Sequence, residues 1–153
     1  MQLFRLSKSL FSNDLSGKGA ELTGGRWNSK GVAMIYCSAS RALCVTEIAV
    51  RVPLGILPTD YKLITLEIPD NIPVTELKND QLPADWKSIP HSASTQEMGD
   101  RFIVANKYLI LKVPSVVVQG DFNYLINPGH KEMRKVRIVN TETFSFDDRI
   151  YRK

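Results

Sequence analysis

Residues 24–47 read GGRWNSKGVAMIYCSASRALCVTE, and they combine a glycine turn, an apolar segment and a helical segment. Gly24 and Gly25 predict a turn, because glycine takes positive φ values and lets a ligand approach the backbone closely. Arg26 follows at once, and a guanidinium on a glycine turn suits a phosphate group, which it holds through two parallel hydrogen bonds. The alternative is a surface arginine on an ordinary turn. Judged from this stretch alone, the surface arginine is the favoured interpretation, because charged groups often have only a structural role.

The apolar and helical segments predict a buried strand followed by a helix. Residues 31–36 are almost continuously apolar, which is typical of a strand buried on both faces. Ser38 or Ser40 caps the helix, which is expected to end near Arg51 because Pro53 follows.

Glu47 is the acidic residue of this predicted helix. At 100° per residue, Glu47 falls at the edge of the side that it shares with Cys44 and Arg51, and it is bordered by a broad apolar face. A carboxylate at such an edge either borders a cleft or pairs with Arg51 four residues later. The apolar face consists of Ala42, Leu43, Val45, Ile48, Ala49 and Val52.

Composition and length indicate one soluble globular domain. The chain has 153 residues, of which 43% are hydrophobic and 24% charged, so it can bury a substantial core. No apolar run reaches the ~18 residues that a membrane-spanning helix needs, and the N-terminus does not resemble a signal peptide. The net charge of +4 favours an anionic ligand or an acidic partner. Without a dense basic stripe, direct nucleic-acid binding is a minor alternative.

Cys37 and Cys44 are expected to be buried or partly buried free thiols. A disulfide is the alternative, but Cys44 falls in the middle of the predicted helix, and no metal-ligand pattern accompanies either thiol. We therefore expect a reducing, cytoplasmic location and no metal site.

The other predicted elements do not alternate regularly between strand and helix, which favours an α+β domain with a mixed or antiparallel sheet over a doubly wound parallel fold. We expect a single domain over residues 1–153. Strands are predicted at residues 3–6, 61–68 (with one solvated face), 108–113, 116–118, 136–139 and 143–146. An edge strand or an extended loop is predicted at 72–77, a helix at 92–105 capped by Ser94 or Thr95, a loop at 7–19 and a polar tail at 147–153.

Two further stretches draw attention to possible chemistry. Pro114 and Ser115 interrupt an apolar segment, which predicts a kink or bulge, and bulges often direct side chains at a site. Asn127-Pro128-Gly129 predicts a turn, and His130 follows it. Ser115 and His130 together are compatible with a hydrolase, but no nucleophile-elbow pattern surrounds Ser115. No phosphate-loop, dinucleotide or zinc motif occurs.

Several weakly specific motifs follow one another in an order that is strongly specific as a set. In this ordered set the chain resembles the RES-domain family, the toxin half of bacterial RES–Xre toxin–antitoxin pairs. The arginine, glutamate and serine that give the family its name correspond to Arg26, Glu47 and Ser115. The motifs are Gly17-Lys18-Gly19-Ala20, Gly24-Gly25-Arg26-Trp27-Asn28, Tyr36, residues 42–47, Leu82-Pro83-Ala84-Asp85-Trp86, Val113-Pro114-Ser115, Asn123-Tyr124-Leu125-Ile126-Asn127-Pro128 with His130, and Phe146-Asp147-Asp148-Arg149.

The resemblance implies an ADP-ribosyltransferase-like fold and a toxin that degrades NAD⁺ by cleaving the nicotinamide–ribose bond. Arg26 and Arg5 are then expected to hold pyrophosphate or ribose oxygens, and Tyr36 to stack on nicotinamide or hydrogen-bond beside it. Glu47 would orient the ribose hydroxyls and stabilise the developing oxocarbenium charge. Ser115 would bond the ribose or orient Arg26.

The same resemblance suggests additional substrate-binding residues and partners. Trp27 and Asn28 are candidates beside Arg26, and Asn127 and His130 are either binding or structural residues. NAD⁺ enters as substrate, with no separate cofactor. The expected partner is an Xre-like antitoxin whose C-terminal part blocks the cleft of a toxin homodimer.

Alternative functions remain open at this stage. The first hypothesis is a glycohydrolase or phosphorylase, with water or phosphate as acceptor. The second is a mono-ADP-ribosyltransferase that modifies a cellular protein, because a shared fold does not fix the acceptor. The third is a catalytically silent domain that binds a nucleotide or a partner, and the intact Arg26, Glu47 and Ser115 count against it.

Overall fold

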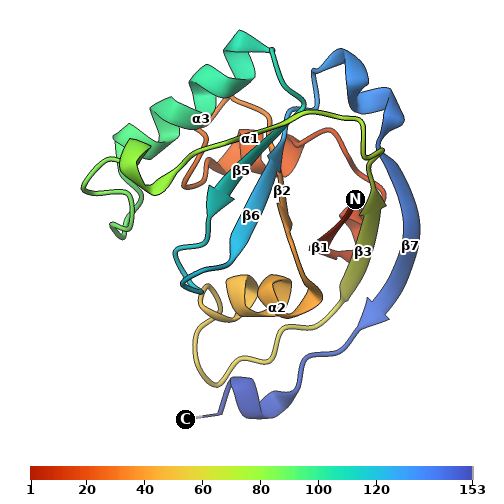
Figure 1. The fold of residues 1–153 in the computed structure, drawn as a ribbon. Coiled ribbons are helices and arrows are strands. Elements are labelled where there is room, and N and C mark those ends of the chain that lie inside the picture. Colours follow the sequence, from red (N-terminus) through yellow and green to blue (C-terminus); the bar gives the residue numbers. More distant parts are fainter. Residues whose placement is uncertain (153) are drawn as a thin grey trace.

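A mixed β-sheet runs through the centre of the protein (Figure 1). The structure, a computed structural model, describes residues 1–152, and within them the sheet has seven strands. Neighbouring strands are antiparallel except for one pair at the edge of the sheet, Val74–Glu76 with Ile110–Pro114, which is parallel. The α+β class with a mixed sheet is therefore confirmed. In spatial order the strands are β4 (Val74–Glu76), β5 (Ile110–Pro114), β6 (Phe122–Ile126), β2 (Ile35–Ser38), β1 (Gln2–Lys8), β3 (Tyr61–Glu67) and β7 (Arg137–Phe144).

The sheet opens between β2 and β1. In the described part of the chain these strands share one register pair, Phe4 with Ser38, whereas β1 pairs with β3 from Gln2 to Lys8. Figure 1 shows the result: β1, β3 and β7 stand apart from β2, β6 and β5. Because the two strands diverge, their side chains border an open space instead of a continuous ladder.

Three α-helices accompany this sheet in the described part of the chain. They are α1 (Lys18–Thr23), α2 (Arg41–Ala49) and α3 (Ala93–Ala105), with short 3₁₀ turns at Ser9–Phe11, Asn79–Gln81, Lys131–Lys135 and Asp148–Ile150. Ser40 begins α2 by accepting a hydrogen bond from the Leu43 N–H, and Ser92 begins α3 in the same way. Among residues 1–152 no helix is both long and apolar enough to cross a bilayer.

Apolar side chains pack on both faces of the β5–β6–β2 half. Successive strand residues point to opposite faces, so Ile110 and Leu111 belong to different core clusters. The first cluster extends to Leu3, Ile64 and Leu66 of the other half of the sheet. The second contains Trp27, Met34, Leu111, Val113 and Leu125, and Met98, Phe102 and Ile103 of α3 pack against it.

Several predicted boundaries are wrong for identifiable reasons. The strand expected at residues 31–36 begins only at Ile35, because Gly31 has φ +92° and the Val32 N–H turns back to the Ser29 carbonyl. The strand expected at residues 116–118 is absent from the described chain. The backbone N–H groups of Val117 and Val118 donate to the Ser115 hydroxyl, so the chain turns after β5.

Other corrections concern larger elements. The loop expected at residues 7–19 contains the end of β1, a 3₁₀ turn and the start of α1, and residues 63–66 of β3 are buried on both faces. The two predicted closing strands form the continuous β7, and Ser92 caps α3 instead of Ser94 or Thr95.

The predicted polar tail is partly packed. Tyr151 is buried and meets Phe146 edge-on, with ring centroids 5.9 Å apart. Lys153, the last residue of that predicted tail, lies outside the described residues.

Replacement of Gly99 by alanine is expected to destabilise the fold, because an ideal Cβ there would lie 1.7 Å from the Trp27 carbonyl oxygen. Overpacking costs about 1–3 kcal/mol or more, and at this chain length each kcal/mol lowers Tm by roughly 2–4 °C. Gly19→Ala is the matched control, since this helix glycine meets nothing within 4 Å. Thermal unfolding should show a clear loss for G99A alone. Unchanged melting of both variants would contradict the close contact.

Candidate active site

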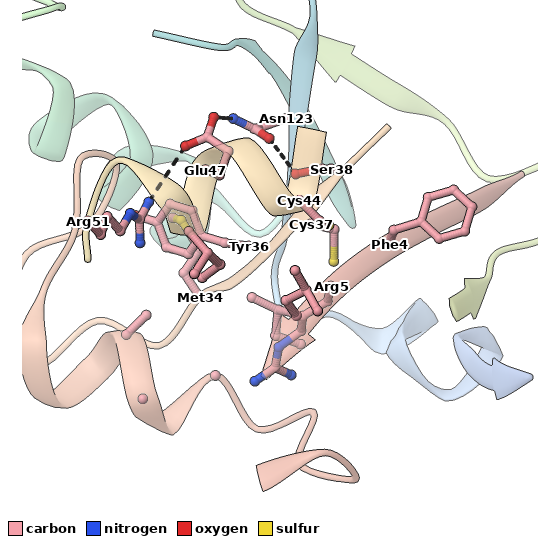
Figure 2. A pocket seen from close by; sticks show the side chains of 16 residues that line it. Phe4, Arg5, Met34, Tyr36, Cys37, Ser38, Cys44, Glu47, Arg51 and Asn123 are labelled. Atoms are coloured by element: carbon pink, nitrogen blue, oxygen red, sulfur yellow. Dashed lines mark hydrogen bonds and ion pairs between the residues drawn. The ribbon is translucent and has the colours of Figure 1, made fainter. Parts of the chain in front are cut away.

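Two adjacent pockets meet on the open side of β2. The first, about 180 Å³ in volume, lies between the diverging strands and is lined by Phe4 and Arg5 of β1 and by Cys37 of β2 (Figure 2). The second, about 400 Å³, lies beside the glycine turn. The residues that line both pockets are Tyr36, Glu47, Arg51 and Asn123. Those that line only the second are Arg26, Trp27, Val50, Ile89, His91, Pro114, Val116 and Val117.

Glu47 lies where the two pockets meet. Its Oε1 accepts hydrogen bonds from the Ser115 hydroxyl at 2.9 Å and from the Asn123 amide at 2.6 Å. Its Oε2 lies 3.9 Å from Nη2 of Arg51, whose side chain is largely exposed. Because Arg51 is exposed and the separation is long, this ion pair is weak. One carboxylate oxygen is therefore fixed while the other remains open to a ligand.

The burial of α2 differs from the predicted helical face. Leu43 and Cys44 are its buried residues, whereas Ala42 is exposed. Glu47 follows Cys44 by three residues and therefore lies on the covered side of the helix, with its side chain 17% exposed. The prediction from apolar periodicity was wrong about the buried face, because the covered side of the helix carries the Cys44 thiol and the Glu47 carboxylate.

Ser115 holds Glu47 and makes no hydrogen bond to Arg26 within residues 1–152. Its buried hydroxyl oxygen accepts the N–H groups of Val117 and Val118, while its single proton goes to Glu47. A hydroxyl with these partners is a fixed donor. The structure thus brings the predicted Glu47 and Ser115 together.

Arg26 lies in the wall of the second pocket. Nη1 donates to the carbonyl oxygens of Trp86 at 2.6 Å and Ser88 at 3.1 Å, and these are the guanidinium's hydrogen bonds within the described chain. Nε and Nη2 are left for a ligand. Burial lowers the pKa of Arg26 and the charge of Glu47 opposes this, but an arginine stays cationic near neutral pH.

Tyr36 connects the glycine turn to β2. Its hydroxyl donates to Asn28 Oδ1 at 2.7 Å and accepts from the Trp27 N–H at 3.0 Å. A Cβ at Gly25 would lie 2.7 Å from this hydroxyl, so only glycine allows the approach. Burial raises the pKa of Tyr36 above its ordinary value, which keeps the phenol neutral. The ring is left to face the pockets.

Trp27 and Asn28, both predicted to bind substrate, are buried in the structure. Trp27 belongs to the second core cluster, although it also lines the second pocket. Asn28 is 0% exposed and donates to the carbonyl oxygens of Ala20 and Val32. Its polar atoms therefore hold the turn, and it does not line either pocket.

Arg5 lies in the first pocket, away from Arg26. Its Nη1 donates to the Asp14 carbonyl oxygen at 2.6 Å. Figure 2 shows its guanidinium directed away from Glu47. Arg5 and Arg26 line different pockets, so the two cations suit different parts of an extended ligand.

Asn127 and His130 are not brought to this site. They follow the end of β6 opposite to Asn123 and line neither pocket. Asn127 donates to Asn106 Oδ1 and accepts from the Gly129 N–H, and His130 Nδ1 accepts from the Glu132 N–H. Both side chains stabilise turns, which was the structural alternative for them.

Sequence reasoning did not assign site roles to Arg51, His91 and Asn123. Burial, together with the charges of Arg26 and Arg51, lowers the pKa of His91, which favours its neutral form. Asn123 faces Ser38 through the β2–β6 register. Strand pairing brings it to Glu47, and no local sequence signal reports such pairing.

Cys37 and Cys44 are buried free thiols, as predicted. They line the first pocket, and burial raises their pKa values to about 12 and about 11, so both stay protonated. Among residues 1–152 no group of three or more His, Cys, Asp or Glu side chains is arranged to hold a metal ion.

A model of the RES domain family matches residues 2–147, and the chain therefore belongs to this family. The family resemblance seen in the sequence is confirmed.

Individual relatives are similar over nearly their whole length. A protein named Prs ADP-ribosylating toxin, from Sphingobium sp. (strain YBL2), is 35% identical over 93% of this chain and 89% of its own. The protein Toxin Res of Photorhabdus laumondii is 35% identical over 98% of this chain and 97% of its own. A chain in the crystal structure of the M. tuberculosis MbcT–MbcA toxin–antitoxin complex has the same fold, with a TM-score of 0.73 at 20% identity, covering 98% of this chain and 86% of that one.

Tyr36→Phe is expected to lower stability by about 1–3 kcal/mol, because it leaves buried Asn28 Oδ1 and the Trp27 N–H without their partner. Tyr124→Phe is the control, since the hydroxyl of Tyr124 on β6 makes no hydrogen bond within residues 1–152. Urea unfolding of both variants measures the difference. Equal losses would show that the Tyr36 hydroxyl does not hold the turn.

Proposed function

We propose that this protein is the toxin of a toxin–antitoxin pair and that it cleaves the nicotinamide–ribose bond of NAD⁺. The observation that carries the proposal is the Glu47 carboxylate, with Oε1 held by two donors and Oε2 open toward a cleft that contains Arg26. The relative named an ADP-ribosylating toxin supports it, because such an enzyme must break this bond in its ADP-ribose donor.

The chemistry suits a site with a fixed anion and no strong acid. The nicotinamide ring nitrogen is cationic in NAD⁺, so the base takes the electrons of the C–N bond and leaves neutral, without protonation. The ribose becomes an oxocarbenium-like cation, as at other glycosidic centres. A carboxylate already fixed beside this carbon stabilises the new charge without reorganising. Glu47 Oε2 can also accept a ribose hydroxyl.

The cleft consists of two adjoining pockets, which suits an extended dinucleotide. Glu47 and Tyr36 line both pockets, which puts the reacting ribose between them. Either pocket can offer a cation to the pyrophosphate, because Arg5 lines the first, Arg26 lines the second and Arg51 lines both. The Tyr36 ring offers a face for nicotinamide, because its hydroxyl is already bonded to the turn.

Water or phosphate is the acceptor that we expect for the ADP-ribose. Residues just before Glu47 offer no second base: Val45 is apolar, and the Thr46 hydroxyl donates to the Ala42 carbonyl. Transfer to a protein is the second candidate. It is favoured by the name of the Sphingobium relative and by exposed Val50 and Ile89, which line the second pocket and offer apolar contacts to a protein.

An antitoxin partner is part of the same proposal. The structural neighbour comes from a toxin–antitoxin complex, which supports an antitoxin partner. We extend this to an Xre-like antitoxin, a toxin homodimer and a cytoplasmic location.

Glu47→Gln is expected to reduce nicotinamide release from NAD⁺ by ~10²–10³-fold, the usual cost of one transition-state electrostatic contact. Glutamine keeps an oxygen for Ser115 and Asn123, so melting should change little. Glu142→Gln is the control, because Glu142 accepts bonds from Arg41 and Asn140 on β7, outside the cleft. No release by the wild type, or near-normal release by E47Q, would refute the proposed reaction.

The acceptor is identified with labelled NAD⁺, incubated with and without phosphate and with cell lysate. We expect most label in free ADP-ribose or its phosphorylated form, because the cleft cations attract phosphate and water needs little activation. Label found mainly on one lysate protein, at substoichiometric enzyme, would instead select the transferase.

A further inference from the structure

We propose that Asn123 is a positioning residue for catalysis, which with Ser38 fixes Oε1 of Glu47 and so presents Oε2 to the substrate. The inference rests on the proposed function. It concerns a residue that does not touch the reacting atoms and acts only through Glu47.

The orientation of the Asn123 amide is set by its neighbours. An ionised carboxylate only accepts, so Asn123 presents Nδ2 to Glu47, and its Oδ1 accepts from the Ser38 hydroxyl at 2.8 Å. The antiparallel register of β2 and β6 pairs Ser38 with Asn123 directly. Figure 2 shows the chain of contacts from Ser38 through Asn123 to Glu47.

Ser115 alone cannot fix the carboxylate in the same way. A carboxylate with a single donor can rotate and exchange its two oxygens about that contact. Asn123 adds a second donor from another strand, at the charge-assisted distance of 2.6 Å, and both donors meet the same oxygen. Oε1 is thereby occupied, and Oε2 is left for the ribose.

The amide also leaves the charge of Glu47 intact. A lysine at position 123 would neutralise the carboxylate, and an aspartate would repel it. Asparagine donates a hydrogen bond with no charge of its own, so the full negative charge remains to stabilise a cation. Position 123 therefore requires a neutral donor of this length.

The test compares Asn123→Ala and Asn123→Asp with Asn140→Asp. Asn140 is the matched control, because its Nδ2 donates to Glu142 Oε2 at 2.7 Å on the exposed surface of β7. N123A should lower kcat by about 10²-fold, the order of loss for a misplaced catalytic group, with a much smaller change in KM. N140D should leave both constants unchanged.

The pH dependence of N123D separates positioning from packing. The introduced carboxyl is isosteric, and the charge of Glu47 raises its pKa. Below that pKa it carries a proton and can donate to Glu47 as the amide does, whereas above it the two carboxylates repel. The N123D to wild-type ratio of kcat should therefore rise as pH falls. Arg26, Arg51, Tyr36 and Cys44, which act on this site, are common to both proteins and cancel in the ratio.

A pH-independent ratio, or kcat values for N123A equal to the control, would overturn the proposal. If N123A does not fold, the isosteric N123D decides alone. If the wild type releases no nicotinamide, the proposed reaction fails separately, and crystal structures of wild type and N123A then decide the positioning role. A Glu47 carboxylate unmoved in N123A would overturn it, and a displaced carboxylate would support it.

Discussion

The hydrogen bonds on Glu47 Oε1 hold together elements that are distant in the sequence. Ser115 lies after β5, Asn123 on β6 and Glu47 on α2, so the carboxylate has its geometry only when the sheet and the helix are assembled. The sheet supplies the opening as well, because β1 and β2 separate after the Phe4–Ser38 pair. Buried acceptors without partners are costly, and the same bonds that satisfy Oε1 select which oxygen faces the cleft.

Elements with a strong local pattern were predictable from the sequence. The α2 and α3 helices, β3 and the edge strand β4 have apolar periodicity or proline boundaries that fix their type. The segment after Ser115 was not predictable in this way. Val116, Val117 and Val118 favour a strand by composition, yet the Ser115 hydroxyl captures the N–H groups that a strand would need. A side chain bonded to the backbone here outweighs β propensity.

The residues of the candidate site also differ in whether the sequence could predict them. Arg26, Tyr36 and Glu47, which occur in the family motifs, line the cleft, and Ser115 donates a hydrogen bond to Glu47. Asn28, Asn127 and His130 occur in motifs of the same kind, but their polar atoms bond nearby backbone or turn groups. A motif does not distinguish a residue that shapes a turn from one that meets a ligand. Helical spacing places Arg51 beside Glu47. His91 and Asn123 reach the cleft through tertiary structure, which a single sequence does not report.

The balance of charge in the cleft fits a substrate that changes charge as it reacts. Arg5, Arg26 and Arg51 make the surroundings cationic, which suits the anionic pyrophosphate of NAD⁺, while Glu47 is the acid that lines both pockets. In the NAD⁺ cleavage that we propose, the positive charge lies on nicotinamide before the bond breaks and moves to the ribose carbon as it breaks. An anion fixed between the two pockets stays close to this charge throughout and need not follow it. In the proposed reaction, the nicotinamide that leaves is neutral and loses its attraction to Glu47, whereas the arginines would keep the ADP-ribose part bound until an acceptor captures the cation.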